Sequence, residues 1–400
     1  MKLYISKPDA AAGNIVADDM ILTTDMPTSA GSKMLDGYKS LFEAEAVTRL
    51  KDAEYGICGK ANTGELGLDL LGETSYYGAC ADEKGNLTNA VAEIVKAEEA
   101  MAGITLEVNG SSARAAALSS LTYVKPTYGT VSRYGTIPAV CSGETVSVTA
   151  KSASTCREIL SVLAGHDDKD GTSLPQEKCA LLKADAQRAP VKKIVVAKSL
   201  LSSADAATAE IISAYIEKAR KNGIEVAEID AEELRLAKPA WNILLSAEVC
   251  NNVSRYDGVK FGYRSADSSN IDDLYTNSRT EAFGYLLKSV ILFGSDVLST
   301  ENYMSVYDKA LRIRRVVSEY MNSVLEDADA ILLPACSKRS YTEEEARKNP
   351  YIAYDESFYT APALITGLPA VVTEGVQIVG RAFAENSLLD LAELLEKGGE

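Results

Sequence analysis

The chain has 400 residues, of which 46% are hydrophobic and 24% charged, a composition that suits a folded protein with a large core and excludes a disordered one. Its formal net charge of −16 repels phosphate backbones and anionic bilayers, so we expect neither direct nucleic-acid binding nor membrane association. No stretch approaches the ~18 apolar residues of a membrane span and the first six residues lack a secretion signal's apolar segment, so we expect a cytoplasmic protein.

The first predicted helices lie in the N-terminal half. One follows Gly85 and runs through an alanine-rich stretch to Ala102. Another helical pattern ends at Gly165, with His166 placed near its last carbonyls. Because His166 is the only histidine, any Ser-His-Asp triad or histidine-rich metal site would depend on it alone.

A βαβ unit is predicted in the middle of the chain. Residues 193–197 form a short apolar run typical of a buried strand, and Ser203 is a candidate N-cap for an amphipathic helix that ends near Asn222. Gly223 stops this helix, and residues 224–229 form the next strand. Such a unit indicates a parallel or mixed sheet that is covered by helices.

Further elements follow toward the C-terminus. Apolar residues recur on one face of a long helix from about Asn302 to Leu325, and residues 331–334 and 370–373 are strand candidates. No internal repeat or low-complexity linker divides the sequence. We therefore predict one α/β domain that spans residues 1–400.

Metal and cofactor chemistry are not indicated. Seven cysteines lie scattered without a Cys-x-x-Cys pair, as expected for buried thiols in a reducing compartment. We expect no metal and no cofactor.

Three motifs carry a resemblance to one enzyme family. They are Lys125-Pro-Thr-Tyr-Gly-Thr-Val-Ser-Arg-Tyr-Gly135, Leu163-Ala-Gly-His-Asp167 and Ser254-Arg-Tyr-Asp-Gly-Val-Lys-Phe-Gly-Tyr263. On these residues the chain resembles the amidase-signature family, and within it the A subunits of glutamyl-tRNA amidotransferases. The resemblance covers nearly the whole chain, with a shortened N-terminal helical region. It implies the amidase-signature fold, a mixed central β-sheet with helices on both faces.

The position of the catalytic lysine is changed. The resemblance implies a mechanism in which a lysine deprotonates a bridging serine, which activates a nucleophilic serine beside backbone N–H donors. Where the family has Lys-Asp-Asn-Ile, this chain has Asp18-Asp19-Met20-Ile21, so Asp18 stands in the lysine position. A carboxylate of pKa ~4 is a poor acceptor of a hydroxyl proton at neutral pH unless burial raises its pKa strongly.

The two serine positions are also altered. The glycine- and serine-rich loop of the bridging serine is absent, and Thr88 or Leu87 takes its place, depending on the alignment. Threonine and asparagine before an alanine-rich run are also ordinary helix caps. Keeping the family's Ser-x-Arg pattern assigns the nucleophile position to Ser112, whereas counting back from Lys125 without gaps assigns it to Ser111. Gly110 before them would allow a remnant oxyanion nest.

The substrate-binding positions differ as well. A polar Met-Gly-Ser-Ser stretch of the family is replaced by Leu68-Asp-Leu-Leu71, whose apolar side chains would fill a pocket. Ser289, in Lys288-Ser-Val-Ile291, stands where the resemblance implies the glutamine-recognising arginine, and Ser357 stands where it implies an acidic partner. Losing the arginine matters because a hydroxyl poorly replaces a bidentate guanidinium.

Two functions follow from these changes. The first is a non-catalytic amidase-like protein, a scaffold or regulatory subunit that works through a protein partner. The resemblance suggests that this partner is another amidotransferase-type subunit. The second is an amidohydrolase or glutamine amidotransferase with a rearranged serine site and another base such as Lys125. The 20 tyrosines suit contacts with a partner, but tyrosine can equally replace phenylalanine in the core.

Overall fold

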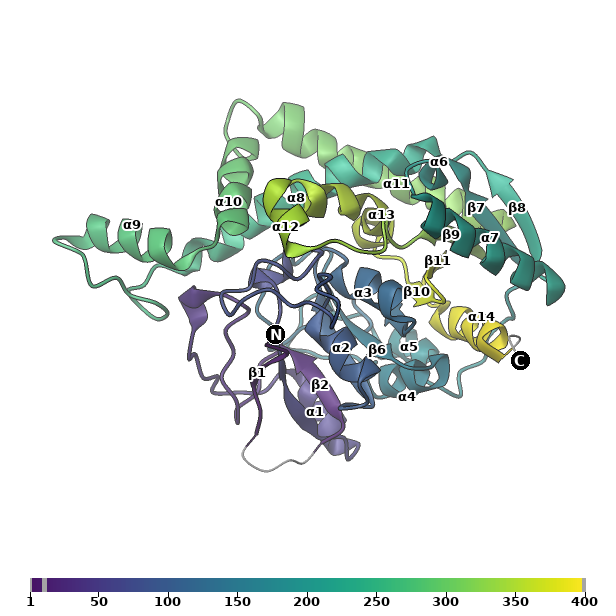
Figure 1. Cartoon of the computed structure of the whole chain (residues 1–400), viewed down its shortest axis with the longest axis horizontal. Helices are drawn as coiled ribbons and strands as arrows, with labels where there is room; N and C mark the ends of the chain where they lie inside the picture. Colours follow the sequence, from purple (N-terminus) through teal and green to yellow (C-terminus); the bar gives the residue numbers. More distant parts are fainter. Residues whose placement is uncertain (1, 9–12, 398–400) are drawn as a thin grey trace.

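One continuous mixed sheet of eleven strands crosses the part of the chain that the computed structural model describes, residues 2–8 and 13–397 (Figure 1). The spatial order of its strands is β1-β3-β2-β4-β6-β5-β10-β11-β9-β7-β8. The strand bounds are β1 Tyr4–Ser6, β2 Ile15–Asp18, β3 Ile57–Ala61, β4 Ala102–Glu107, β5 Thr122–Lys125, β6 Thr145–Ala150, β7 Lys193–Ala197, β8 Glu225–Ile229, β9 Ala330–Pro334, β10 Ala370–Thr373 and β11 Val376–Gly380.

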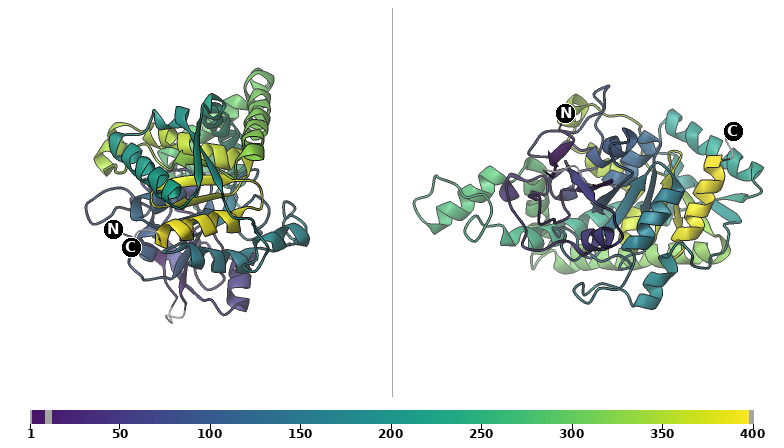
Figure 2. Two further views of the ribbon diagram at one scale, coloured as in Figure 1. Left: turned by 90° about the vertical axis from the view of Figure 1, so that its right-hand side faces the viewer. Right: turned by 90° about the horizontal axis from the view of Figure 1, so that it is seen from below.

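Helices cover both faces of this sheet, which confirms the expected fold class (Figures 1 and 2). Their bounds are α1 Glu45–Asp52, α2 Ala90–Lys96, α3 Ser111–Ser119, α4 Ala153–Leu163, α5 Gln176–Cys179, α6 Lys198–Leu201, α7 Ala206–Lys221, α8 Ala237–Asn252, α9 Ile271–Ala282, α10 Tyr285–Val297, α11 Asp308–Asp327, α12 Glu343–Lys348, α13 Ile352–Thr366 and α14 Glu385–Lys397. Among the described residues, no helix combines the length and apolarity that crossing a bilayer requires.

Alternation along the central strands separates two cores. Val124 of β5 and Val371 of β10 enter the larger core, to which α4 and α14 contribute. Their neighbours Tyr123 and Val372 enter a smaller core built with α2 and α3. Successive side chains of a strand point to opposite faces, so each central strand is buried on both sides.

The predicted βαβ unit is present. Strands β7 and β8 are parallel neighbours joined through α7, and β9 pairs in parallel with β7 on the other side. The predicted N-cap is wrong, because Asp205 rather than Ser203 accepts the N–H of Thr208 at the start of α7. The predicted strands at 331–334 and 370–373 are confirmed as parts of β9 and as β10.

Other predicted boundaries shift. Helix α2 ends at Lys96, and Ala102 instead begins β4. The long C-terminal helix is confirmed, although its first turn, Tyr303–Tyr307, is π-helical.

The predicted role of His166 at the end of α4 is wrong. Helix α4 ends at Leu163, and its last carbonyls accept hydrogen bonds from Arg49 and Lys183. The ring of His166 instead contacts the carbonyl of Leu174 and an exposed aspartate. Long cations from other segments thus satisfy this helix end, a contact that local sequence cannot reveal.

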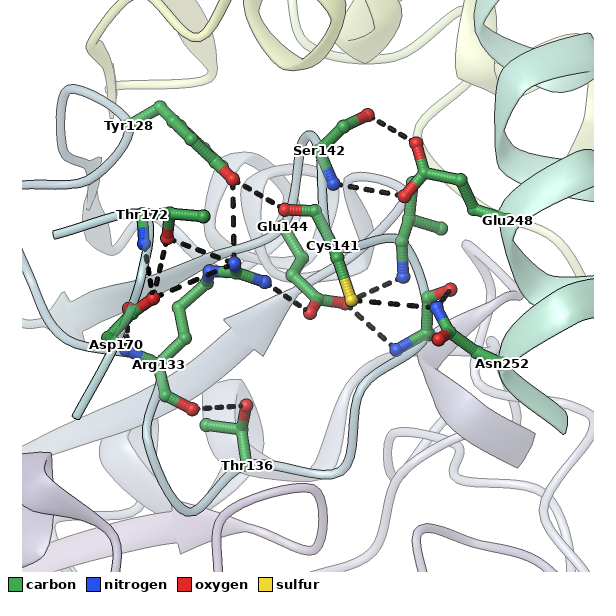
Figure 3. A network of polar contacts seen from close by, with 12 residues as sticks. Tyr128, Arg133, Thr136, Cys141, Ser142, Glu144, Asp170, Thr172, Glu248 and Asn252 are labelled. Atoms are coloured by element: carbon green, nitrogen blue, oxygen red, sulfur yellow. Dashed lines mark hydrogen bonds and ion pairs between the residues drawn. The ribbon is translucent and has the colours of Figure 1, made fainter. Parts of the chain in front are cut away.

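The segment 125–135 is held by a buried polar network (Figure 3). The Arg133 guanidinium lies 2.7 Å from a carboxylate oxygen of Glu144, which is fully buried. Burial raises the pKa of Glu144, and the neighbouring guanidinium opposes that shift. Arg133 also donates to Thr172 at 3.0 Å, and Tyr128 donates from its hydroxyl to the carbonyl of Cys141 at 2.5 Å. Arg133 and Tyr128 of this motif therefore have a structural role.

The same network ties the connection between β5 and β6 to distant helices. Glu248 of α8 accepts the N–H of Ser142 at 3.0 Å, and Asn252 of the same helix donates to the carbonyl of Ala139 at 3.0 Å (Figure 3). Arg314 of α11 donates to the carbonyl of Ser142 at 2.9 Å. The central strands and the helices of the second half are thus joined through one loop.

We predict that Arg133→Met lowers the free energy of unfolding by about 3–5 kcal/mol, because it leaves Glu144 buried without its cation. Urea unfolding measures the change. The matched control is Arg315→Met, which removes an exposed ion pair with Glu319 and should cost less than about 1 kcal/mol. The double variant Arg133→Met/Glu144→Gln should recover part of the loss. If both arginine variants lowered the free energy of unfolding equally, the buried pair would contribute no more to stability than the exposed pair.

Candidate functional site

Strand β4 and helix α3 position the two candidate nucleophiles. The chain leaves β4 at Glu107, turns through Gly110 and enters α3 at Ser111. Gly110 has a φ of +106°, and a Cβ there would lie 2.3 Å from the Thr360 side chain. Glycine is required at this position for both its backbone conformation and its close approach to α13.

Ser111 and Ser112 lie in different surroundings. Ser111 is partly exposed, and its hydroxyl accepts a hydrogen bond from the side-chain amide of Asn89 at 3.2 Å. Ser112 is 3% exposed, and its hydroxyl donates to Thr105 at 3.1 Å inside the core. Consecutive positions of a helix differ by about 100° around its axis. Ser112 therefore faces the sheet, whereas Ser111 faces a small cavity beside α2.

The buried carboxylate of Glu107 occupies the N-terminus of α3. It accepts the backbone N–H groups of Gly110 at 2.7 Å, Ser112 at 3.1 Å and Ala113 at 3.2 Å, and the Tyr123 hydroxyl at 3.0 Å. Burial raises the pKa of Glu107, although these four donors oppose the shift. Three amides that could stabilise an oxyanion therefore already have a partner within the chain. The sequence analysis did not single out this residue.

Asp18, at the end of β2, is buried beside β4. Its two carboxylate oxygens accept the backbone N–H groups of Met20 and Leu106, each at 3.0 Å. Burial raises its pKa to about 8. The shift that a catalytic aspartate would need is present, but both oxygens are turned to backbone amides and neither contacts Ser111 or Ser112.

No lysine in the described part of the chain is hydrogen-bonded to either serine. Lys60 of β3 is fully buried, lies 3.3 Å from Asp19 and donates to Thr28 at 2.8 Å. Burial lowers its pKa. Lys125 donates to the carbonyl of Leu368 at 2.8 Å, and burial lowers its pKa to about 8. The alternative base named from the sequence is therefore hydrogen-bonded to backbone carbonyls and to neither candidate nucleophile.

Thr88 and Ser111 do lie at one cavity, but the cavity is very small. Thr88 is buried and its hydroxyl lies 3.3 Å from a carboxylate oxygen of Glu93. Asn89 caps α2 by accepting two backbone N–H groups. The cavity volume is about 10 Å³, room for about one water molecule.

The leucines that follow Asp69 are packed in the interior. Leu70 and Leu71 are buried, and Leu71 packs against Leu87. These contacts agree with the expectation that the leucines at 68–71 fill space.

The two predicted substrate-binding positions, Ser357 and Ser289, do not line this cavity. Ser357 on α13 is buried and accepts a hydrogen bond from Asn242 at 3.0 Å. Ser289 on α10 is exposed and donates to the carbonyl of Tyr285 at 2.9 Å, one turn earlier. Within the residues described, no three His, Cys, Asp or Glu side chains are placed to hold a metal ion.

Comparison with known proteins places this fold in a family. Residues 15–389 match the Amidase family. The A subunit of the glutamyl-tRNA(Gln) amidotransferase of Ectopseudomonas mendocina (strain ymp) is 34% identical over 394 residues, which cover 94% of this chain and 82% of that protein. The crystal structure of the corresponding A subunit from Thermotoga maritima has a TM-score of 0.80 at 23% identity and is covered to 87%, against 99% of this chain. The K. lactis urea amidolyase has a TM-score of 0.82 at 21% identity, over 95% of this chain and 22% of its own.

The fold and the matched residues together define an α/β protein of the amidase class. The chain belongs to the Amidase family, and its sequence is similar to the A subunits of glutamyl-tRNA(Gln) amidotransferases.

We predict that the contribution of Asp18 to stability falls as the pH rises. Its folded pKa of about 8 lies above the ordinary value of 3.8, so the proton that the folded state retains stabilises it below about pH 4, and this stability is lost as the pH approaches 8. Each unit of difference corresponds to about 1.4 kcal/mol, so the unfolding free energy of the wild type should fall by at least about 2 kcal/mol relative to Asp18→Asn across this range.

Chemical denaturation at a series of pH values measures this difference. The control is Asp52→Asn, because Asp52 is exposed. Parallel pH profiles for the wild type and Asp18→Asn would contradict the prediction.

Proposed function

We propose that this chain is a non-catalytic member of the amidase-signature family that serves as a scaffold or regulatory subunit. The observation that carries the proposal is Asp18, which stands in the lysine position and directs both oxygens to backbone amides. Without an amine beside it, a serine hydroxyl remains a weak nucleophile.

The surroundings of Ser111, which the geometry favours over Ser112 as the vestigial nucleophile position, support the same proposal. The cavity beside it, about 10 Å³, is far too small for an amino-acid amide. The amides at the start of α3 donate to Glu107 and are not free to stabilise a tetrahedral intermediate. The base, the substrate space and the oxyanion donors are thus all unsuited to amide hydrolysis in this proposal.

The role of a subunit rests on the relatives and on one surface. The relative from Ectopseudomonas mendocina is a subunit by name, so a protein partner is part of the proposal. Helix α10 and the π-helical turn that it contacts, Tyr303–Tyr307, expose large apolar side chains: Leu292 is 73%, Phe293 45% and Met304 64% exposed. Apolar side chains of this size gathered on adjoining elements are typical of protein interfaces.

The second candidate function is an amidohydrolase with a rearranged site. Two observations favour it: Ser111 is partly exposed, and Asp18 has a pKa of about 8, in the range of a general base. This function needs a movement that opens the cavity and turns a base toward Ser111.

We predict that release of ammonia from glutamine, asparagine and aliphatic amides is at background. The wild type and Ser111→Ala/Ser112→Ala should give equal rates, because no base contacts either hydroxyl. A coupled ammonia assay measures both proteins. Activity that disappears in the double variant would establish the second function instead.

Asp18→Lys provides a further arm of this experiment. It should remain inactive, since the parts of a triad act as a unit and one restored part recovers little rate. Circular dichroism checks that this variant folds, and the comparison of wild type with the double serine variant remains decisive if it does not.

We predict that the protein, tagged and purified from its native cells, elutes with a stoichiometric protein partner, as measured by light scattering. Leu292→Asp/Phe293→Asp should lose this partner, because buried carboxylates would replace the apolar contacts. The matched control is Leu41→Asp, which alters a 96% exposed leucine elsewhere. A monomer that elutes alone would argue for a stand-alone protein.

A further inference from the structure

A large cavity lies away from the serines, beyond the carboxyl ends of the parallel strands β7, β8 and β9. Ser203 follows β7, Arg235 follows β8 and Ser337 follows β9, and all three line it together with residues of α13. Its volume is about 540 Å³, within the range of small-molecule sites. Open α/β sheets bind ligands at such strand ends.

Helix α13 connects the wall of this cavity to the surroundings of the serines. Thr360 donates to the carbonyl of Asn109 at 2.8 Å, beside the start of α3. Glu356, one turn earlier on the same side of the helix, and Tyr359 line the cavity. Helix α13 lies against α8 and α11 in the upper part of Figure 1, so this wall is built on packed helices.

The acidic wall of the cavity is already satisfied. The carboxylate of Glu356, 1% exposed, lies 3.3 Å from Arg114 and accepts the N–H of Ser337 at 3.2 Å. It also accepts the hydroxyls of Ser337 and, at 3.1 Å, Tyr341. The Glu356 carboxylate is therefore already charge-paired and hydrogen-bonded, so it does not require a cation from a ligand.

The groups that remain unsatisfied are donors. The Tyr359 hydroxyl is buried and makes no hydrogen bond of ordinary geometry within the described residues. Burial raises its pKa, an effect that the nearby Ser203 side chain opposes, so it stays protonated. A buried phenol without an acceptor is costly, and an acceptor in the cavity would relieve that cost.

Arg235 is the first of two cations that flank the same space. One of its terminal nitrogens, Nη2, donates to the carbonyl of Ser199 at 2.6 Å and to the hydroxyl of Ser202 at 3.0 Å. Its Nε lies 2.9 Å from a carboxylate oxygen of Glu232, whose side chain is mostly exposed. These contacts fix the plane of the guanidinium, and a positioned guanidinium is well suited to bind an oxyanion.

Lys238 is the second cation. Its ammonium lies 2.6 Å from Asp355, a contact that engages one of its three N–H bonds. The Asp355 side chain is mostly exposed, and water weakens ion pairs of this kind. The ammonium can therefore also attract an anion in the cavity.

We propose that this cavity binds a small organic anion, a carboxylate or phosphate group on an apolar body. Tyr359, Arg235 and Lys238 hold the oxyanion, and Phe358 and Ile352, which also line the cavity, contact the apolar part. This role is separate from the proposed scaffold function and does not depend on it.

The test uses three probes with a benzene ring: phenyl phosphate, benzoate and benzylamine. Isothermal titration of the full chain at constant ionic strength should show at least one anion binding about tenfold or more tightly than benzylamine. The tighter of the two anions identifies the phosphate or the carboxylate as the natural group. Benzylamine binding as tightly as both anions, or no binding of any probe up to about 10 mM, would overturn the proposal.

Two variants link binding to the cavity. Arg235→Gln should weaken the better anion about tenfold, and Tyr359→Phe, which removes one neutral donor, about three- to tenfold. The matched controls are Arg220→Gln and Tyr275→Phe, both at exposed positions, and they should leave affinity unchanged. Thermal unfolding confirms that each variant folds. Affinity that is unaltered in both cavity variants, or reduced equally in the controls, would place binding elsewhere.

Discussion

The buried pair of Arg133 and Glu144 is the interaction on which the arrangement of this molecule depends most. It lies in the connection between two central strands, β5 and β6, and the same connection is bonded to α8 and α11. A charge in this position is tolerable only when its partner and the remaining donors are all in place. The network therefore imposes one geometry on segments that are far apart in the sequence, the central sheet and the helices that follow β8.

This dependence gives the motif at 125–135 a structural role that does not require a catalytic site. Arg133 and Tyr128 stabilise the scaffold without touching Ser111 or Asp18. Loss of the arginine would leave the buried carboxylate of Glu144 without its cation. Resemblance in scaffold motifs is thus evidence for architecture, and function has to be argued from the site.

Much of the fold could be predicted from the sequence, because strands such as β7 and β9 are apolar runs and the βαβ unit has clear boundaries. The resemblance implied the larger mixed sheet around them. What remained out of reach depends on side-chain direction and on distant segments. Whether Ser111 or Ser112 faces the cavity depends on how α3 is rotated about its axis, and a rotation by one residue exchanges the two serines. The caps of α4 come from Arg49 and Lys183, which lie in other segments. The large cavity is lined by Ser203, Arg235 and Ser337 from three different connections between elements, so no local sequence pattern indicates either feature.

The carboxylate of Glu107 has one more consequence. An enzyme of this mechanism must keep hydrogen-bond donors poised and unfilled until the transition state forms, and that readiness costs stability in the resting protein. Here the amides of Gly110, Ser112 and Ala113 at the start of α3 donate to a carboxylate from the preceding strand. In the proposed non-catalytic role the molecule avoids the compromise between activity and stability at its centre, and freeing these amides for catalysis would make this part of the fold less stable.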